Sequence, residues 1–270
     1  MKKEQISIIG CGWLGLPLAK TLIAKGFNIK GSTTRVSKLN QLKSHNINPF
    51  LVELSTQSLS ESVKAFLDGS ETLIINVPPG LRKTPHKNHV QEIKNLMIHT
   101  EKSTIKNILY ISSTSVFQDT IPFSIINENV NPNAVSNSSQ QLIAIESMLQ
   151  NNPRFNITVL RFSGLFDEGR HPGKILSGRK NIANPEAPVN LIHKEDCVSI
   201  ITKLIEHNFW NDIFNASFPQ HPAKEDYYTA YCKKHNLELP EFDKTKPSKG
   251  KLIDTSKLAQ LLKHEYKTGL

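Results

Sequence analysis

The sequence has little of what marks secreted, membrane-spanning or metal-binding proteins. Its three cysteines, Cys11, Cys197 and Cys232, are widely spaced and odd in number, a pattern that argues against a disulfide framework and suits a reducing cytoplasm. No segment reaches the roughly 18 uncharged apolar residues that a membrane-spanning helix needs, and the first residues do not form a targeting segment. The ten histidines form no H-x-x-x-H or comparable ligand pattern. We therefore expect a cytoplasmic protein with no metal and no membrane partner.

Charge of one sign is in excess, but it is not concentrated anywhere. The chain has 33 Lys and Arg against 24 Asp and Glu, a formal charge of +9, and the lysines are dispersed, often near acids. An arginine-rich arm is missing, and basic residues do not interleave with aromatic ones. A solvated basic surface is therefore favoured over nucleic-acid binding. A basic cleft for a phosphorylated ligand stays compatible with this charge.

Short apolar β-type runs alternate with longer amphipathic segments through the first 160 residues. The clearest helix covers residues 90–102, where Val90, Ile93, Leu96 and Met97 recur at helical spacing. Such alternation predicts right-handed βαβ crossovers and an α/β fold with a doubly wound parallel sheet. Strands are expected at 6–10, 27–32, 49–54, 72–77, 107–112 and 156–162, and helices at 13–25, 36–45, 59–67, 90–102 and 139–150.

The texture changes after Phe162. Residues 163–188 are rich in glycine and proline, which predicts long loops. Further on we expect helices at 196–208, 224–235 and 256–263, a strand at 213–217 and a basic loop at 244–251. The sequence thus predicts a Rossmann-type domain over 1–162. Residues 163–270 would form mostly a small substrate lobe, with some elements returning to the sheet.

A glycine-rich turn follows the first predicted strand and opens the first predicted helix. Residues 10–15, GCGWLG, fit the G-x-G-x-x-G pattern of dinucleotide-binding proteins. Gly10 permits the tight turn, Gly12 lets the backbone approach a pyrophosphate, and Gly15 lets helix and strand pack closely. The turn also carries Trp13 and Leu14, and Trp13 is expected to pack over the cofactor or the adjacent loop. We predict a nicotinamide cofactor here.

The end of the second strand favours NADP, with NAD as second choice. NAD sites usually carry Asp or Glu there, whereas NADP sites avoid the acid and supply Arg. Residues 31–35, GSTTR, contain no carboxylate but offer Thr33, Thr34 and Arg35, whose guanidinium could bind a phosphate through two hydrogen bonds. The alternative is an arginine exposed at a helix start. Residues 76–80, NVPPG, end the fourth strand, so Val77 and Pro78 either flank the adenosine or form a structural turn.

Four later segments, in the expected order, resemble the extended short-chain dehydrogenases/reductases of the NAD(P)-dependent epimerase/dehydratase family. They are ILYISSTSVF at 108–117, LRFSGLF at 160–166, VNLIHKED at 189–196 and IFNA at 213–216. The resemblance implies the Rossmann fold with a C-terminal lobe and a small-molecule substrate. It also implies cofactor contacts from Ser112, Gln140, Ser163 and Gly164. Members of that family often pair through helices of the sheet layer, which leaves a homodimer open without predicting it.

The family's catalytic Tyr-x-x-x-Lys pair has no counterpart at the expected place. Alignment puts Ser136 at the tyrosine position and Gln140 at the lysine position, and none of the five tyrosines is followed by lysine four residues later. A serine hydroxyl is a far poorer acid than a phenol, which titrates near ~10. An uncharged glutamine cannot lower a neighbour's pKa. The usual proton donor would therefore have to be replaced.

Other residues offer weaker candidates for the chemistry. Ser113 matches the family's catalytic Ser/Thr, with Thr114 as the near alternative, although both could simply satisfy a strand end. His171 could transfer a proton, and Arg170 could bind an anionic group such as a nucleotide-sugar phosphate. Either could also be an ordinary loop residue. Ser136 and His193 complete the candidates for substrate binding, His193 with a structural alternative.

These observations support two principal hypotheses. The first is an atypical NADP-dependent oxidoreductase or epimerase acting on a sugar or nucleotide-sugar, in which His171 or an ordered water supplies the proton. The second is a non-catalytic NADP-binding sensor or interaction protein, since loss of the pair would remove the family's mechanism but not its binding site. Nucleic-acid binding is a third and weaker hypothesis, suggested only by the net charge.

Overall fold

A seven-stranded parallel β-sheet is the centre of the computed structural model, which describes residues 4–57, 59 and 61–270. The strand order is β10-β7-β5-β4-β1-β2-β3, so the chain runs outward from β1 in one direction and then in the other. This order confirms the predicted α/β doubly wound fold. The strands are β1 (Gln5–Ile9), β2 (Asn28–Thr33), β3 (Asn48–Leu51), β4 (Thr72–Ile75), β5 (Asn107–Ser113), β7 (Asn156–Phe162) and β10 (Ile213–Ala216).

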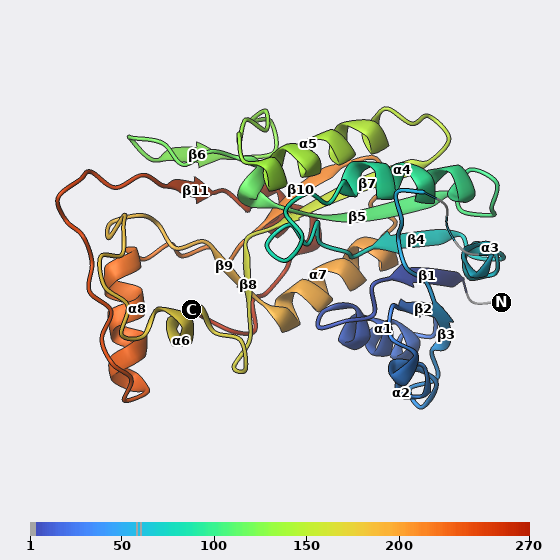
Figure 1. Ribbon diagram of the computed structural model, residues 1–270, viewed down its shortest axis with the longest axis horizontal. Helices are drawn as coiled ribbons and strands as arrows, with labels where there is room; N and C mark the ends of the chain where they lie inside the picture. The colour runs from blue at the N-terminus through green and yellow to red at the C-terminus, as the bar shows by residue number, and fades with distance from the viewer. Residues whose placement is uncertain (1–3, 58, 60) are drawn as a thin grey trace. The chain divides into compact units, whose positions relative to one another are not determined.

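Helices cover both faces of the sheet. In Figure 1, α4 and α5 lie along one face, and α1 and α7 lie along the other. Strand β4 is buried at every position, as a central parallel strand covered on both faces must be. On α1, Leu18 and Leu22 are one turn apart and fully buried against the sheet layer. The helices are α1 (Gly15–Ala24), α2 (Leu39–Lys43), α3 (Ser62–Leu67), α4 (His89–Thr100), α5 (Asn137–Gln150), α6 (Pro172–Leu176), α7 (Lys194–Glu206), α8 (Lys224–Lys234) and α9 (Ser256–Leu262).

The prediction of continuous loops over 163–188 is wrong. This segment contains β8 (Gly164–Phe166), which pairs with β9 (Leu191–His193), and the short helix α6. Two other predictions need smaller corrections. The helix expected over 36–45 is divided into a 3₁₀ turn (Val36–Lys38) and α2. The helix expected over 59–67 begins at Ser62, and residue 60 of that range lies outside the described residues.

The chain divides into two compact units, each built from separate segments. Unit 1 comprises Met1–Ser113, Ser136–Leu160 and Val198–Ile213, and unit 2 comprises Thr114–Val135, Arg161–Cys197 and Phe214–Leu270. Unit 2 contains the β8-β9 pair and a second parallel pair of β6 (Ser124–Ile126) with β11 (Lys251–Ile253). Its core includes the cluster Phe166, Val189, Leu191 and Tyr228.

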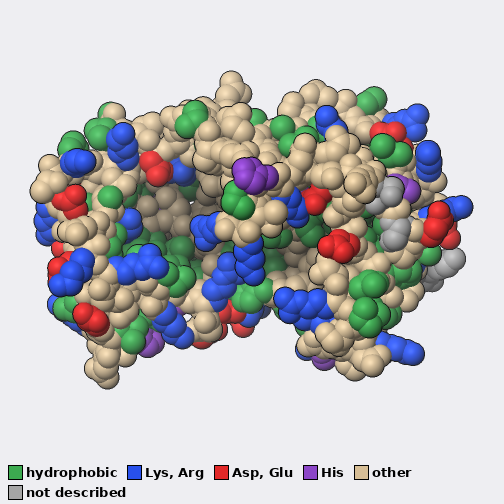
Figure 2. All heavy atoms as spheres, in the orientation of Figure 1, with side chains coloured by type: hydrophobic (Ala, Val, Ile, Leu, Met, Phe, Trp, Pro, Cys, Tyr) green, Lys and Arg blue, Asp and Glu red, His purple; other side chains and the backbone are tan. Residues whose placement is uncertain are grey.

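The cysteines are unpaired, and charges of both signs mix on the visible face of the molecule. All three cysteines are buried and free. Lys and Arg side chains are spread over the face seen in Figure 2, with Asp and Glu among them. Within the described ranges, every helix is too short or too polar to cross a membrane.

Candidate functional site

Two glycines of the turn between β1 and α1 are required by close backbone contact. Gly10 has a φ of +98°, and a Cβ there would lie 2.4 Å from the carbonyl oxygen of Asn76. A Cβ on Gly15 would lie 2.2 Å from the carbonyl oxygen of Gly10. Backbone oxygens cannot swing aside as a side chain can, so neither position accepts a larger residue without moving the chain. The packing roles predicted for Gly10 and Gly15 agree with these contacts.

Gly12, in contrast, is free of any such packing requirement. It is exposed, and a Cβ built on it would meet no atom within 4 Å. The missing side chain therefore leaves an open surface on the turn, beside the N-terminus of α1, whose first amides and dipole attract anions. A dinucleotide's pyrophosphate would need this space. Trp13 is half-buried next to it, and Leu14 is buried at the start of α1.

Two polar side chains that the sequence analysis did not single out hold this turn in place. The Ser32 hydroxyl accepts a hydrogen bond from the Gly10 amide at 3.0 Å, and the Asn76 amide group donates to the Gly10 carbonyl at 3.1 Å. Cys11 lies beneath the turn, where burial raises the pKa of its thiol to about 12, so it stays protonated. Ser32 and Asn76 lie in segments that the sequence analysis assigned to strand ends. Only the pairing of β1 with β2 and β4 shows that both contact Gly10.

The predicted NADP-selecting residues follow the carboxyl end of β2. The Thr33 side chain is buried, and its hydroxyl accepts from the backbone amide of Arg35 at 3.2 Å. Thr34 and Arg35 are exposed. After β4, Val77 is half-buried and Pro78 is exposed. Because parallel strands end at one edge of a sheet, these residues lie at the edge that carries the glycine turn.

The candidate residues around β5 and α5 have contacts within the protein. The Ser112 hydroxyl donates to the Glu146 carboxylate of α5 at 2.5 Å, and both residues are buried, so Ser112 faces the helix. Ser113 ends β5. Ser136 is the N-cap of α5 and accepts from the Ser139 amide at 3.2 Å, and Gln140 is exposed on the first turn. Glu146 gave no signal in the sequence.

In unit 2, two of the predicted cofactor contacts, Ser163 and Gly164, lie at the start of β8, and Thr114 lies next to Ser163. Thr114 is buried and donates to the Ser163 hydroxyl at 3.5 Å, a long hydrogen bond. Gly164 is required by packing, since a Cβ there would lie 2.7 Å from the Leu191 side chain. The structure therefore brings Thr114 and Ser163 together and gives Gly164 a steric reason.

His171 lies in an aromatic cluster and caps a helix. Its Nδ1 accepts from the Gly173 amide at 3.0 Å, so Nε2 carries the proton and donates to the Tyr227 hydroxyl at 2.9 Å. Its ring stacks on Tyr231 at 3.7 Å. Burial lowers the pKa of His171 to about 4, with smaller contributions from His235 and Lys174. This neutral imidazole therefore uses both of its nitrogens in hydrogen bonds within unit 2.

His193 and Arg170 occupy the ends of short elements. His193 is buried at the end of β9, where Nδ1 accepts from the Glu195 amide at 3.3 Å and helps to start α7. The backbone of Arg170 forms a turn with Asp167, and its side chain is exposed. Asp167 is buried and also forms a close ion pair with Lys194. These contacts agree with the structural alternative for His193.

Unit 2 contains a pocket of about 280 Å³ that the sequence did not reveal. We call it the basic pocket. Gly250 lets two of its walls approach, because a Cβ there would lie 2.7 Å from Pro188. The described residues that line it are Thr114, Asp119, Asn184, Ala187, Pro188, Val189, Asn190, Leu191, Lys224, Tyr228, Lys249, Gly250 and Lys251.

Two lysines of the basic pocket have different partners. Lys251 is paired, since its Nζ lies 2.9 Å from Asp119 and donates to the Phe117 carbonyl. Lys224, at the start of α8, donates to the Ala183 carbonyl at 2.9 Å. Burial lowers the pKa of Lys224, while nearby Asp119 acts in the opposite direction. The lining contains three lysines, the third being Lys249, and one carboxylate, Asp119, so positive charge is in excess.

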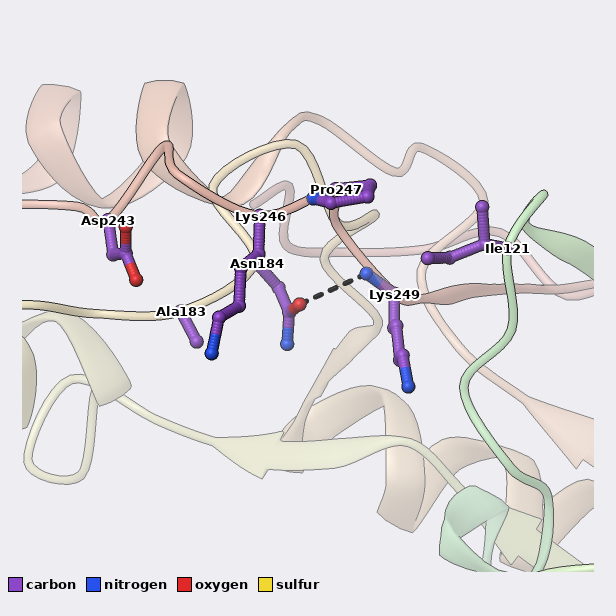
Figure 3. Close-up of a pocket in the computed structure, with 7 residues that line it drawn as sticks. All are labelled: Ile121, Ala183, Asn184, Asp243, Lys246, Pro247 and Lys249. Carbon is purple, nitrogen blue, oxygen red and sulfur yellow. Dashed lines mark hydrogen bonds between the residues drawn. The ribbon is translucent and has the colours of Figure 1, made fainter.

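A second pocket of about 270 Å³ adjoins the first and is drawn in Figure 3. The two share Asn184 and Lys249, and the Asn184 side-chain oxygen accepts from the Lys249 amide at 3.0 Å, the dashed line in the figure. Ile121, Ala183 and Pro247 give this pocket apolar walls, and Asp243 and Lys246 give it charged ones. The pair of pockets suits a ligand with an anionic group and a less polar extension.

The same fold occurs in solved structures of other proteins. A functionally unknown conserved protein from Silicibacter pomeroyi has a TM-score of 0.78 and 19% identity, over 98% of this chain and 94% of that one. The UDP-glucuronic acid 4-epimerase of Bacillus cereus in complex with NAD has a TM-score of 0.80 and 13% identity, over 98% and 92%. A short-chain dehydrogenase/reductase superfamily protein from Agrobacterium tumefaciens with bound NAD has values of 0.78 and 12%, over 98% and 93%.

In sequence, the chain is similar to two proteins of Escherichia coli. Protein YeeZ of strain K12 and protein YeeZ of strain O157:H7 are each 33% identical to it over 266 residues, which is 97% of this chain and 96% of theirs. No family model matches the chain.

Proposed function

The chain belongs to the family of Escherichia coli protein YeeZ, and we propose that it is an NAD(P)-binding oxidoreductase or epimerase of the extended short-chain dehydrogenase/reductase type. The observation that carries this proposal is the exposed Gly12, between two glycines that packing requires. The protein's own atoms would leave room for an alanine at Gly12. A ligand that approaches the backbone there would explain why the residue is glycine. A nicotinamide dinucleotide supplies hydride transfer when it is bound.

NADP is the cofactor we favour, with NAD as second choice. Arg35 is exposed at the carboxyl edge of the sheet, and no carboxylate stands in residues 31–35 to bind a ribose hydroxyl. Thr33 and Thr34 would hold the same end of the cofactor. The Bacillus cereus and Agrobacterium proteins are described with NAD, which supports a nicotinamide dinucleotide as the cofactor class. The preference for NADP over NAD is supported by Arg35 and not by these proteins.

The substrate we propose is a small anionic molecule, in finer terms a sugar or nucleotide-sugar. The excess positive charge of the basic pocket supports an anion there. Burial keeps the pKa of Tyr228 well above its usual value, so its phenol stays protonated and would donate to a substrate oxygen. Thr114 lines the pocket, so its hydroxyl would bind the substrate there. Ser113, the preceding residue, is a further hydroxyl proposed for the substrate.

A second candidate function is dinucleotide binding without turnover, as in a sensor or interaction protein. It is favoured by the absence of lysine four residues after any of the five tyrosines. The His171 geometry supplies no replacement, because that ring is neutral and already hydrogen-bonded. Turnover of NADPH in the presence of candidate sugars and nucleotide-sugars separates the two functions.

Calorimetric titration with NADPH, NADP and NAD tests the proposal. We expect NADP(H) to bind with micromolar affinity and Arg35→Ala to weaken it selectively. Arg154→Ala is a matched control, since it removes the same charge from an exposed residue just before β7, at the opposite edge of the sheet. Tight NAD binding that ignores Arg35→Ala would reverse the cofactor preference. Failure of every dinucleotide to bind would overturn the proposed function.

A further inference from the structure

The loop between β4 and α4 is closed by a buried histidine for which the sequence predicted no role. The loop begins at Asn76, which holds the glycine turn, and continues through Val77 and Pro78, the predicted cofactor contacts. It ends at His89, the first residue of α4, whose side chain is completely buried. Pro78, near the loop's beginning, is thus exposed, whereas His89 at its end is buried.

His89 is part of a polar group of three residues, of which His89 and Glu92 are buried and Lys87 is half-buried. Its Nδ1 lies 2.9 Å from the Glu92 carboxylate, one turn further along α4, and the Lys87 ammonium lies 3.0 Å from the same carboxylate oxygen. Glu92 is itself only 5% exposed. A carboxylate this deep is costly unless it is paired, so the three side chains hold one another in a fixed arrangement.

Helix α5 fixes the same segment from its other side. The Gln141 side chain accepts from the His89 amide at 2.7 Å and donates to the Lys87 carbonyl at 3.0 Å. The Asn137 side chain donates to the Pro85 carbonyl at 3.4 Å. The end of the loop is thus held by backbone contacts to α5 as well as by the Glu92 carboxylate.

The beginning of the loop contacts this group through Lys87. A Cβ built on Gly80, two residues after Pro78, would lie 3.9 Å from the Lys87 ammonium nitrogen, which Glu92 holds at 3.0 Å. His89 holds the same carboxylate oxygen of Glu92, and burial lowers the pKa of His89 whereas Glu92 acts to raise it. The end of the loop is thus joined to its beginning through Glu92 and Lys87.

We infer that His89 is a positioning residue that keeps Val77 and Pro78 in place for the dinucleotide. This inference rests on the proposed function, because the cofactor is what Val77 and Pro78 would contact. His89 does not touch the cofactor in this account. It acts through the loop: it holds Glu92, which holds Lys87 against Gly80 near the loop's beginning, so that the loop need not be ordered when the cofactor binds.

His89→Leu tests the inference, with His89→Asn as the conservative rescue because the asparagine amide can still donate to Glu92. If His89→Leu leaves the loop in its binding-competent conformation in only a tenth of the molecules, NADPH affinity falls about tenfold. His89→Asn should retain most of that affinity. His99→Leu is the matched control on the last turn of α4. Should His89→Leu fail to fold, Glu92→Gln removes the charged partner instead.

Limited trypsin digestion without cofactor gives an independent measure of the loop. Arg82 and Lys83 are exposed in its middle, and we expect faster cleavage there in His89→Leu than in the wild type, His89→Asn or His99→Leu. Unchanged cleavage with unchanged NADPH affinity would overturn the inference. If the wild type binds no dinucleotide, the proposed function fails and the positioning role fails with it, while faster cleavage would still show that His89 closes the loop.

Discussion

The glycine turn and the basic pocket are both candidate binding regions, but they are built in opposite ways. The turn consists of six consecutive residues whose backbone would contact the dinucleotide, and two of its glycines, Gly10 and Gly15, are dictated by contacts of 2.4 Å and 2.2 Å. The basic pocket draws its lining from four stretches of chain, near residues 114–119, 184–191, 224–228 and 249–251. A backbone site depends on local geometry, whereas a side-chain site depends on how distant segments pack.

The largest effect should come from breaking the turn itself. Gly10→Ala would add a Cβ 2.4 Å from a carbonyl oxygen, at a φ of +98° that alanine rarely adopts. Strain and overpacking together should lower the free energy of unfolding by about 4 kcal/mol. Urea denaturation measures this loss. Gly69→Ala is the control, because Gly69 also has positive φ but its nearest non-neighbouring atom is a side-chain nitrogen at 3.5 Å. Equal losses in both variants would mean that backbone conformation alone matters.

An effect nearly as large is expected in unit 2 from Asp196, on the first turn of α7. This buried carboxylate accepts from the His264 ring, the Lys267 amide and the Thr268 hydroxyl. Burial raises the pKa of Asp196, but these hydrogen bonds outweigh burial and hold it below its usual value. Asp196→Ala would leave three donors without their acceptor and should cost about 3 kcal/mol.

The same aspartate predicts a pH dependence. A carboxyl whose pKa is lower in the folded state binds fewer protons there than in the unfolded state, so its stabilisation is complete above the unfolded pKa of about 4 and is lost as pH falls through the folded value. Asp196→Asn should therefore flatten the loss of stability below about pH 4. Thermal unfolding from neutral to acid pH measures this slope. Asp254→Asn is the control, because the carboxylate that it removes lies near the surface. An unchanged acid slope would contradict the role of Asp196.

The comparison between the turn and the pocket also explains what the sequence could predict. The seven-stranded sheet, the glycine turn and strand β7 at 156–162 follow from local periodicity and local spacing. The β8-β9 pair was missed because each strand has three residues and is defined only by its distant partner. Nothing in the local sequence distinguishes Lys224 and Lys249 from surface lysines, because the pocket is formed by packing of distant segments. In the same way, the contacts of Asn76 and Ser32 with Gly10 depend on strand pairing.

A substitution at Gly12 separates binding from folding. Gly12→Ala meets no protein atom within 4 Å, so the thermal unfolding temperature should change little, in contrast to Gly10→Ala. If the dinucleotide uses this space, NADPH affinity should fall at least tenfold, or about 1.4 kcal/mol. Calorimetry on both variants measures it. Undiminished affinity in Gly12→Ala would show that the open surface is not the dinucleotide's place.

The smallest effect should come from the basic pocket, where Lys224 and Lys251 provide an internal contrast. Lys251 forms an ion pair with Asp119. The Lys224 ammonium donates to the Ala183 carbonyl, and Asp119 acts on it only through its charge. We expect inorganic pyrophosphate to stabilise the wild type by about 1 kcal/mol at several times its dissociation constant, and Lys224→Met to lose most of that increment. Lys251→Met should instead lower stability without ligand, because Asp119 loses its partner. Since anions also stabilise proteins by exclusion from the surface, the increment has to be compared with Lys180→Met, an exposed lysine outside the pocket. An equal increment in all three variants would mean that the pocket's charge binds no anion, and that the substrate must be recognised elsewhere.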